Sequence, residues 1–332
     1  MTTMADVARL AGVSAKTVSR VYNDDPHVDP GTRERVRAAI DELGYVPNTL
    51  ARTFRTGEPA AVGLAVPDIS DPFFAAIAHA VEAEANRRGM AVVMTSTGLD
   101  PADERRRVEA LLRRQLSGLI LAPTADDHRY LEPWAQRVPV VFVDRAPRRL
   151  AADHFLDDDR GGAAAATEHL LDLGHRRIAF IGDSELLPTI ANRLEGYRKA
   201  LAEKGIGDDE TLVVMGVDDR PGARSALREL MALPEPPTAL FLANARASIA
   251  CVPALRDLGV AGLSLIGFGD FPMADALDPA LTVIDQNPAK LGGLAIARVL
   301  DRIDHPGRRF RRGNVEPVRL IERASCRRVG QD

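Results

Sequence analysis

The residues whose chemistry stands out lie at the start of a short helical segment near the N-terminus. Ser14 can cap a helix that covers the sequence AKTVSRVYN. Lys16 and Thr17 lie in its first turn, and Arg20 follows one turn later. Lys and Arg side chains can donate hydrogen bonds to guanine, and Thr can contact a base or a phosphate. The start of this helix therefore has the chemistry needed to contact base edges in the major groove of DNA.

Helical signals also fill the sequence around this segment. Thr3 can cap a first helix that ends at Gly12, and a third helix is expected to open at Thr32. Two helices joined by a tight turn with glycine form a helix-turn-helix, whose second helix enters the major groove. A helical bundle used for protein contacts is the alternative. Residues 1–57 contain eight Lys and Arg against seven Asp and Glu, so we expect DNA affinity to depend on the placement of these charges and on dimer formation.

From about residue 60 the pattern changes to short apolar runs that alternate with amphipathic helices. Eight runs are recognisable, among them AVGLAV, GLILA, PVVFV and RIAFIG. Such alternation is typical of buried parallel strands covered by helices on both faces. Eight strands are too many for one five-stranded unit, so we expect two linked α/β lobes with doubly wound parallel sheets. Ligands of such sheets bind at the carboxyl ends of the strands.

Composition and motifs argue against several classes of protein. The formal net charge of −4 argues against a basic surface for bulk binding of nucleic acid. No signal peptide is recognisable, and no apolar stretch approaches the roughly 18 residues that a membrane span needs. Cys251 and Cys326 lack neighbours at metal-ligand spacing, and the common phosphate-loop, dinucleotide and hydrolase motifs do not occur. We expect a cytoplasmic protein that is not an enzyme and has no membrane partner, metal or cofactor.

The longer motifs resemble the lactose repressor/galactose repressor family. DVARLAGVSAKTVSRVYND and TRERVRAAIDELGYVPNTLAR are similar to its DNA-binding headpiece. The similarity continues through GLAVPDISDPFF, HLLDLGHRRIAFIG, RLEGYRKAL, LSLIGFGD and DPALTVIDQ, so it covers nearly the whole chain. The resemblance implies a ligand-responsive, sequence-specific transcription regulator, by family default a repressor. It also implies a homodimer on double-stranded operator DNA with a pseudo-palindromic sequence.

The resemblance further implies how the DNA is contacted. The base-reading pair of the family falls on Ala15 and Lys16, and the linker becomes a hinge helix that enters the minor groove. Phe54 stands where the family has a leucine wedge, and phenylalanine can also wedge between base pairs. The alternative is that Phe54 packs one hinge against the other. The expected DNA-binding residues are Thr3, Ser14, Ala15, Lys16, Thr17, Ser19, Arg20, Asn23, His27, Thr32, Asn48, Ala51, Phe54 and Arg55.

The remainder of the chain resembles the two-lobed, periplasmic-binding-protein-like core of the same family, in which a small-molecule effector binds between the lobes. We expect the headpiece to cover residues 1–47, the hinge 48–58, and the ligand-binding and dimerisation domain 59–332. Within this domain, lobe 1 is expected to comprise about 59–157 and 288–314, and lobe 2 about 158–287 and 315–330. The expected ligand-binding residues are Asp71, Phe73, Asp144, Arg145, Arg193, Asn244, Arg246 and Asp270. Several have plainer alternatives, since Asp71 can cap a helix, Phe73 can be core, and Arg193 can pair with Asp144.

Two departures from the family pattern leave the effector open. Sugar-responsive members have acidic residues where this chain has Ala245 and Gly269, and Arg246 is added nearby. A sugar-like or an anionic effector is compatible with this pocket. The alternative is a degenerate pocket, in a cytosolic solute-binding sensor whose DNA binding does not respond to an effector. We expect a dimer rather than a tetramer, because no leucine heptads follow LIERASC.

Overall fold

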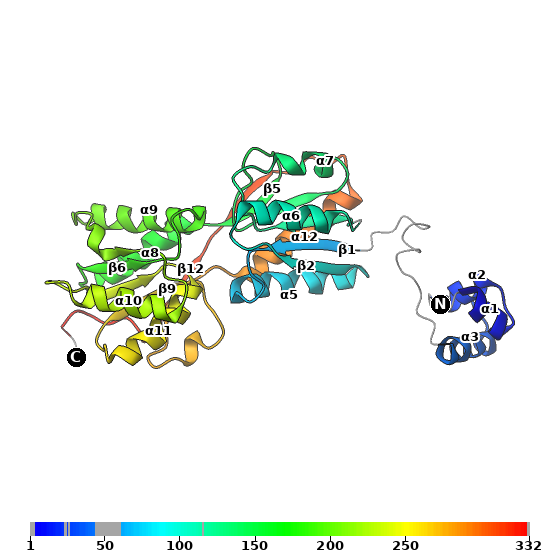
Figure 1. Cartoon of the computed structure of the whole chain (residues 1–332), viewed down its shortest axis with the longest axis horizontal. Coiled ribbons are helices and arrows are strands. Elements are labelled where there is room, and N and C mark those ends of the chain that lie inside the picture. The colour runs from blue at the N-terminus through cyan, green and yellow to red at the C-terminus, as the bar shows by residue number, and fades with distance from the viewer. Residues whose placement is uncertain (1–3, 23–24, 26, 44–60, 115, 331–332) are drawn as a thin grey trace. The chain divides into compact units, whose positions relative to one another are not determined.

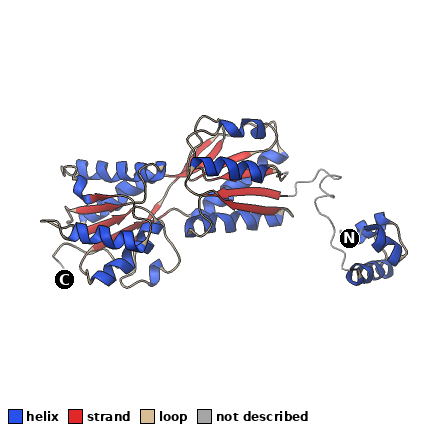
Figure 2. Cartoon of the chain, in the orientation of Figure 1, coloured by secondary structure: helices blue, strands red, loops and turns tan. Residues whose placement is uncertain are grey.

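The computed structural model describes residues 4–22, 25, 27–43, 61–114 and 116–330 (Figure 1). The chain divides into two compact units, residues 1–60 and 61–332. The larger unit contains two α/β lobes, each built on its own sheet (Figure 2). Among the described residues, no helix is long and apolar enough to cross a membrane.

The smaller unit is a bundle of three helices, α1 (Met4–Ala11), α2 (Ala15–Tyr22) and α3 (Pro30–Glu42). Gly12 has a φ of +67°, a left-handed conformation that ends α1 and that glycine adopts without strain. The predicted start of α3 at Thr32 is wrong. Asp29 caps this helix instead, since its carboxylate accepts a hydrogen bond from the Thr32 backbone amide at 3.0 Å.

The bundle buries a small apolar core that all three helices share. Val7 comes from α1, Val18 and Val21 come from α2, and Val36 and Ala39 come from α3. These residues recur at helical spacing, so each helix turns one apolar face inward. The opposite face of α2 remains free to carry polar side chains.

Lobe 1 is built on a six-stranded parallel sheet with the order β11-β5-β4-β3-β1-β2. Its strands are β1 (Ala61–Val66), β2 (Ala91–Ser96), β3 (Gly118–Leu121), β4 (Val140–Val143), β5 (Asp153–Asp157) and β11 (Gly313–Glu316). Its helices are α5 (Pro72–Arg87), α6 (Pro101–Leu112), α7 (Glu132–Ala135) and α12 (Pro288–Asp304), with a 3-10 turn at Arg129–Leu131. Both faces of the sheet are covered, because Ile120 packs with the α5 and α12 side chains and Leu119 packs with those of α6.

Lobe 2 repeats this architecture with the strand order β12-β10-β9-β8-β6-β7, in which only β12 is antiparallel to its neighbour. Its strands are β6 (Ile178–Ile181), β7 (Val213–Val214), β8 (Ala239–Leu242), β9 (Ser264–Phe268), β10 (Thr282–Asp285) and β12 (Arg319–Ile321). Its helices are α8 (Asp159–Asp172), α9 (Pro188–Glu203), α10 (Arg220–Met231) and α11 (Ala245–Leu258), with 3-10 turns at Glu210–Leu212 and Ala274–Ala276. The predicted fold class is confirmed.

The chain crosses between the lobes three times. It leaves lobe 1 after β5, returns after β10, and leaves again after β11. The sequence did not reveal these strands or β12, because each is short and carries polar residues among its apolar ones. Asp157 lies at the first crossing and Gln286 at the second, and their side chains are joined by a hydrogen bond. Gln286 also lines a pocket between the two sheets.

Two adjacent glycines of α12 have opposite surroundings, which allows a matched test of the lobe 1 core. A Cβ at Gly292 would lie 2.6 Å from the carbonyl oxygen of Ile77 in α5, whereas a Cβ at Gly293 would meet no atom within 4 Å. We expect Gly292→Ala to lower the free energy of unfolding by about 1–3 kcal/mol, since backbone must move. Gly293→Ala should raise it by about 0.5–1 kcal/mol through helix propensity. Urea unfolding followed by circular dichroism measures both, and equal effects would contradict the close packing of α5 and α12.

Candidate functional site

The start of α2 presents polar side chains away from the core of the bundle. The Ser14 hydroxyl accepts a hydrogen bond from the Thr17 backbone amide at 3.2 Å, so the predicted cap is present. Ala15 and Lys16 are exposed, while Thr17 is half-buried. The predicted reading pair is therefore accessible at the N-terminal end of a short, fixed helix.

Further along, the C-terminal end of α2 is held by the loop that follows. Arg20 is exposed and lies 3.6 Å from the carboxylate of Asp25. Hydrogen bonds from the His27 backbone amide and ring lower the pKa of Asp25, which keeps that carboxylate charged. Ser19 and Thr32 are half-buried and His27 is exposed. The expected DNA-binding residues that lie outside the described part of the chain are Thr3, Asn23, Asn48, Ala51, Phe54 and Arg55.

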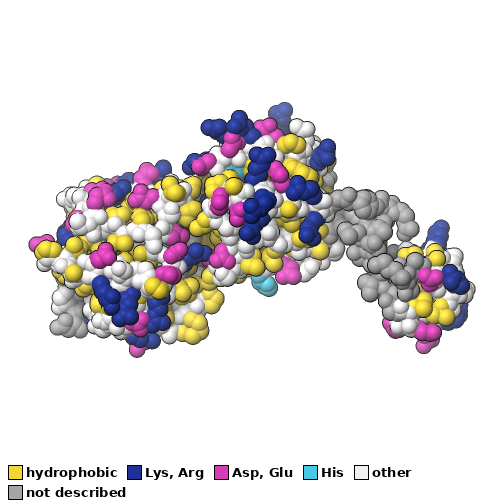
Figure 3. Space-filling model, viewed as in Figure 1, with side chains coloured by type: hydrophobic (Ala, Val, Ile, Leu, Met, Phe, Trp, Pro, Cys, Tyr) yellow, Lys and Arg dark blue, Asp and Glu magenta, His cyan; other side chains and the backbone are white. Residues whose placement is uncertain are grey.

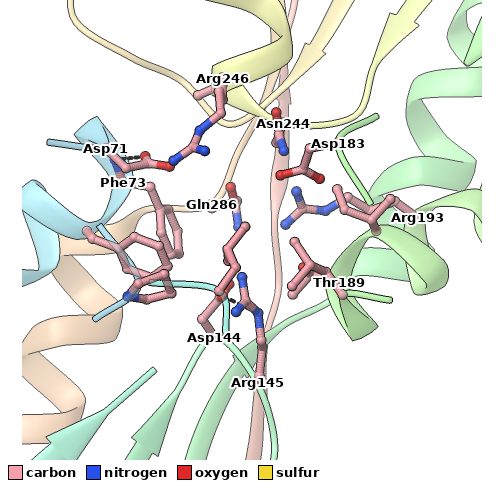
Figure 4. A pocket seen from close by; sticks show the side chains of 16 residues that line it. Asp71, Phe73, Asp144, Arg145, Asp183, Thr189, Arg193, Asn244, Arg246 and Gln286 are labelled. Carbon is pink, nitrogen blue, oxygen red and sulfur yellow. Dashed lines mark hydrogen bonds and ion pairs between the residues drawn. The ribbon is translucent and has the colours of Figure 1, made fainter. Parts of the chain in front are cut away.

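A pocket lies between the two lobes of the larger unit, at the carboxyl ends of strands from both sheets (Figure 4). Its empty space, counted with its open mouth, is about 570 Å³. The lining residues are Pro67, Asp71, Phe73, Phe74, Leu99, Asp144, Arg145, Asp183, Leu187, Thr189, Ile190, Arg193, Asn244, Ala245, Arg246 and Gln286. Polar groups thus converge from both sides on a wall that is partly aliphatic and aromatic, as in many small-molecule sites.

Seven of the eight expected ligand-binding residues line this pocket, and Asp270 does not. The Asp270 carboxylate is held instead by the Arg323 guanidinium, with oxygen–nitrogen distances of 2.6 and 3.0 Å. The position of Asp270 after β9 predicts that it lines the pocket. In the structure its carboxylate instead forms an ion pair with Arg323, which follows β12. The expectation for Asp270 is therefore not met in this structure.

Asp71 and Phe73 combine a structural task with a place in the pocket lining. The Asp71 carboxylate caps α5, since it accepts a hydrogen bond from the Phe73 amide at 2.9 Å. Burial raises its pKa. The Phe73 ring meets Phe74 edge to face, with 5.2 Å between the ring centroids. Asp71 therefore caps α5 and also lines the pocket, so its two predicted roles are compatible.

Arg193 is fixed inside lobe 2 by three contacts. Its Nε donates to Asp159 at 2.7 Å and its Nη1 donates to the Ala243 carbonyl at 2.8 Å. Its guanidinium also stacks 3.8 Å from the centre of the Phe268 ring. The expected alternative partner Asp144 forms an ion pair with Arg145 at 3.2 Å instead. Both buried arginines therefore already have carboxylate partners.

Three buried carboxylates lie where the chain passes between the lobes. Burial raises the pKa of Asp144, that of Asp159 to about 6, and that of Asp157 to about 8. Repulsion from Asp144 adds to the effect at the other two, whereas the Arg193 charge opposes it. The Asp157 carboxylate accepts one hydrogen bond, from the Gln286 amide at 2.9 Å. Burial therefore favours the protonated form of Asp157 in the folded protein.

Comparison with known proteins extends these observations. Residues 3–48 match the family model for bacterial regulatory proteins of the lacI family, and residues 167–326 match that of a periplasmic binding protein-like domain. The ribose operon repressor of Escherichia coli (strain K12) is 35% identical, over 98% of this chain and all of that protein. The HTH-type transcriptional regulator GalS of Salmonella typhimurium is 36% identical, over 89% of this chain and 88% of that protein. The chain belongs to the lacI family.

Solved structures agree with this assignment. The lac repressor dimer bound to operator and the anti-inducer ONPF matches 98% of this chain and 99% of that chain, with a TM-score of 0.82 and 26% identity. The complex of the transcriptional regulator CelR with cellobiose covers 98% of this chain and all of that chain, with a TM-score of 0.69 and 30% identity. As a member of the lacI family, this protein is a DNA-binding transcription regulator and not an enzyme.

Sequence reasoning missed several pocket residues of this lacI-family chain. Asp183 follows the strand RIAFIG directly, so the rule that ligands meet strand ends could have found it. Gln286 follows β10, which was not recognised as a strand. A Cβ at Gly269 would lie 3.1 Å from the Gln286 amide oxygen. The absence of a side chain at Gly269 thus leaves room for this amide.

The raised pKa of Asp157 predicts a pH dependence of stability. Its unfolded pKa is near 4, so from there up to its folded value of about 8 the unfolded chain binds fewer protons than the folded one. This carboxyl therefore costs increasing stability as the pH rises from about 4 to about 8. We expect the stability gain of Asp157→Asn over the wild type to be larger at pH 8 than at pH 5, by at least about 1 kcal/mol.

Thermal unfolding across this pH range measures the effect. Asp158→Asn is the matched control, because Asp158 is the neighbouring residue, is exposed, and uses its side chain to cap α8, a role that asparagine can fill. The control should leave the pH profile unchanged. A wild-type profile that Asp157→Asn does not alter would show that Asp157 is ionised in the folded protein.

Proposed function

We propose that this lacI-family protein is a cytoplasmic, ligand-responsive repressor that binds a pseudo-palindromic operator as a homodimer. The observation that carries the proposal is the presence, in one chain, of an exposed recognition-helix start and a polar pocket between two lobes. Support comes from a relative that is named a ribose operon repressor and that matches 98% of this chain. The similarity to a lac repressor dimer bound to operator supports the same function. A single headpiece offers little surface, and two paired half-sites provide the affinity that sequence-specific regulation needs.

DNA reading is assigned to the start of α2. Lys16 is exposed there, and its ammonium can donate to the major-groove edge of guanine. Ala15 beside it offers an apolar contact of the kind that a thymine methyl group accepts. Arg20 lies one turn later, and Asp25 limits its freedom. The two exposed neighbours therefore set the base preference, while Ser14 and Thr17 fix the end of the helix.

The pocket chemistry favours a small hydroxyl-rich effector. Arg145 and Arg193 are already paired with carboxylates, so they offer little free charge to an anionic ligand. Asp71, Asp183 and Asn244 supply oxygen acceptors around the same space (Figure 4). Carboxylate and amide oxygens accept hydrogen bonds from sugar hydroxyls. The ribose operon repressor and the cellobiose complex of CelR among the relatives support the same class.

Substitution of Lys16 tests the DNA-reading assignment. A duplex is first selected by the full-length protein from a random library. We expect Lys16→Ala to weaken binding to this duplex by about 1–3 kcal/mol and to relax the preference at one base pair of each half-site. Fluorescence anisotropy with single-base variants of the duplex measures both effects.

The control for Lys16 is Arg37→Ala, which removes the same charge from an exposed position of α3. It should leave the base preference intact. A Lys16→Ala protein that keeps the wild-type preference at every position would contradict the assignment, and a wild-type protein that selects no sequence would contradict the proposed function.

Asp71 offers a test of the effector site that separates charge from structure. We expect a thermal-shift screen of pentoses, hexoses, sugar acids and purines to identify a neutral polyol that raises the melting temperature. Asp71→Asn should weaken this ligand at least tenfold, because it removes the carboxylate while asparagine still caps α5. Isothermal titration calorimetry measures the affinities.

Asp100→Asn is the matched control for Asp71. Asp100 caps α6 in the same way, with a hydrogen bond of 2.8 Å from the Ala102 amide, and it lies outside the pocket lining. Equal affinities for the two variants would remove Asp71 from the effector site. A screen in which only acids act would replace the polyol by an anion, and a screen without hits would favour a regulator that does not respond to a small molecule.

A further inference from the structure

Lobe 1 has a strong excess of arginine along one edge of its sheet. All six strands run in the same direction, so the connections that lead into their first residues lie at one edge. The connections into β2, β3, β4 and β11 contain eight arginines and no aspartate or glutamate. We call these residues the arginine edge: Arg88, Arg113, Arg114, Arg137, Arg308, Arg309, Arg311 and Arg312.

Backbone hydrogen bonds tie these connections to the starts of neighbouring strands. The Ser117 amide donates to the Ala61 carbonyl at 2.8 Å, and the Leu119 amide donates to the Pro139 carbonyl at 2.9 Å. The His154 amide donates to the Arg312 carbonyl at 2.8 Å. The edge therefore includes Ala61, the first residue of β1 and the point at which the chain arrives from the DNA-binding unit.

The longest connection, residues 305–312, is held in a defined shape. The guanidinium groups of Arg298 and Arg302 each lie 4.7 Å from the centre of the Phe310 ring. They also donate to backbone carbonyls of the loop, at 3.0 and 3.3 Å. Both guanidinium groups also form an ion pair with the buried carboxylate of Asp153. Arg298 and Arg302 thus hold the loop, and the four arginines of the loop itself remain exposed.

Most of the arginine edge lacks a counter-charge. Arg88 pairs with Asp304, and Arg113 lies 3.9 Å from Glu109. The other six arginines form no ion pair with any residue in the described part of the chain, and all eight are exposed. Figure 3 shows one face of lobe 1, on which Lys and Arg side chains are mixed with Asp and Glu, whereas the connections that form the arginine edge contain no acidic residue. Such a surface attracts anions and is only weakly neutralised by the protein itself.

The arginine-rich composition of the chain does not explain this surface. Lobe 2 has the same architecture, yet the connections into β6, β7, β8 and β9 carry both signs of charge. Their charged residues are Arg176, Arg177 and Lys204 against Asp208, Asp209, Glu210 and Glu235. The opposite edge of lobe 1 is mixed as well, because Arg148 and Arg149 there pair with Asp126 and Asp127. Within the described part of lobe 1, arginines without nearby carboxylates are therefore concentrated at the arginine edge.

We propose that the arginine edge binds the phosphate backbone of duplex DNA, as a second contact beside the helix-turn-helix. Guanidinium groups bind phosphate oxygens in pairs of hydrogen bonds. Residues 44–60 join the two units and span at most roughly 60 Å when fully extended. DNA that is bound by the first unit is therefore kept at high local concentration near Ala61 and the arginine edge. This tether favours DNA over an acidic protein as the partner.

The contact adds affinity that does not depend on base sequence. Phosphate contacts release counterions, and each one steepens the fall of log K with log salt concentration by about 0.9. The edge therefore holds the regulator on DNA in general, while α2 chooses the site. The inference rests on DNA binding and not on the identity of the effector.

The test compares two full-length variants with the same change in net charge. The first is R308Q/R309Q/R311Q/R312Q, and the second is R176Q/R224Q/R228Q/R256Q, whose four positions are exposed in lobe 2. Binding is measured over a range of salt concentrations. The probes are the duplex selected by the wild-type protein and a duplex of arbitrary sequence and the same length. Thermal unfolding checks that both variants fold.

We expect the lobe 1 variant to bind both duplexes more weakly by the same factor, with a salt slope shallower by about 2–4 per chain than that of the lobe 2 variant. Equal salt slopes for the two variants would overturn the proposal and leave an acidic protein as the partner to be sought. Weakening confined to the selected duplex would also overturn it. If the wild-type protein selects no sequence, the proposed function fails, while the arbitrary duplex still tests the arginine edge.

Discussion

The shared direction of the parallel strands is the constraint on which the chemistry of this protein depends. Helices cover both faces of each sheet, so functional side chains gather at the two edges without opening the apolar core. The ends of β1, β4, β6 and β8 supply the pocket. The connections into the lobe 1 strands supply the arginine edge, at the other end of the sheet. One backbone direction thus places paired charges at one end of the lobe 1 sheet and mostly unpaired arginines at the other.

Two arginines of the pocket wall are each paired with a buried carboxylate. Arg193 is bound to Asp159, and Arg145 lies beside Asp144. Asp157 forms no ion pair with any residue that the structure describes, and its burial favours the protonated carboxyl. Such an arrangement fixes the buried arginines, since the removal of one partner would leave a desolvated charge. The groups that remain free for a ligand are those nearer the open space, among them Asp71 and Asp183.

Local signals explain what the sequence could predict. Ser14 and Gly12 mark the ends of two helices within a few residues, so the helix-turn-helix was recognisable. Strand ends identified most of the pocket in the same way. Distant partners explain the failures, because Arg323 removes Asp270 from the pocket across 53 positions of sequence. Gln286 was missed since β10 is short, and the start of α3 was misplaced because Asp29 captures the amide of Thr32.

The three crossings between the lobes have a consequence for how this protein can be recombined with its relatives. Neither lobe is one continuous stretch of chain, because each contains strands from separate parts of the sequence. A chimaera that exchanges lobe 2 needs three junctions, after β5, after β10 and after β11. A single proteolytic cut at any one of these junctions leaves the lobes covalently joined by the other two. The helix-turn-helix unit, by contrast, can be exchanged through one junction before Ala61.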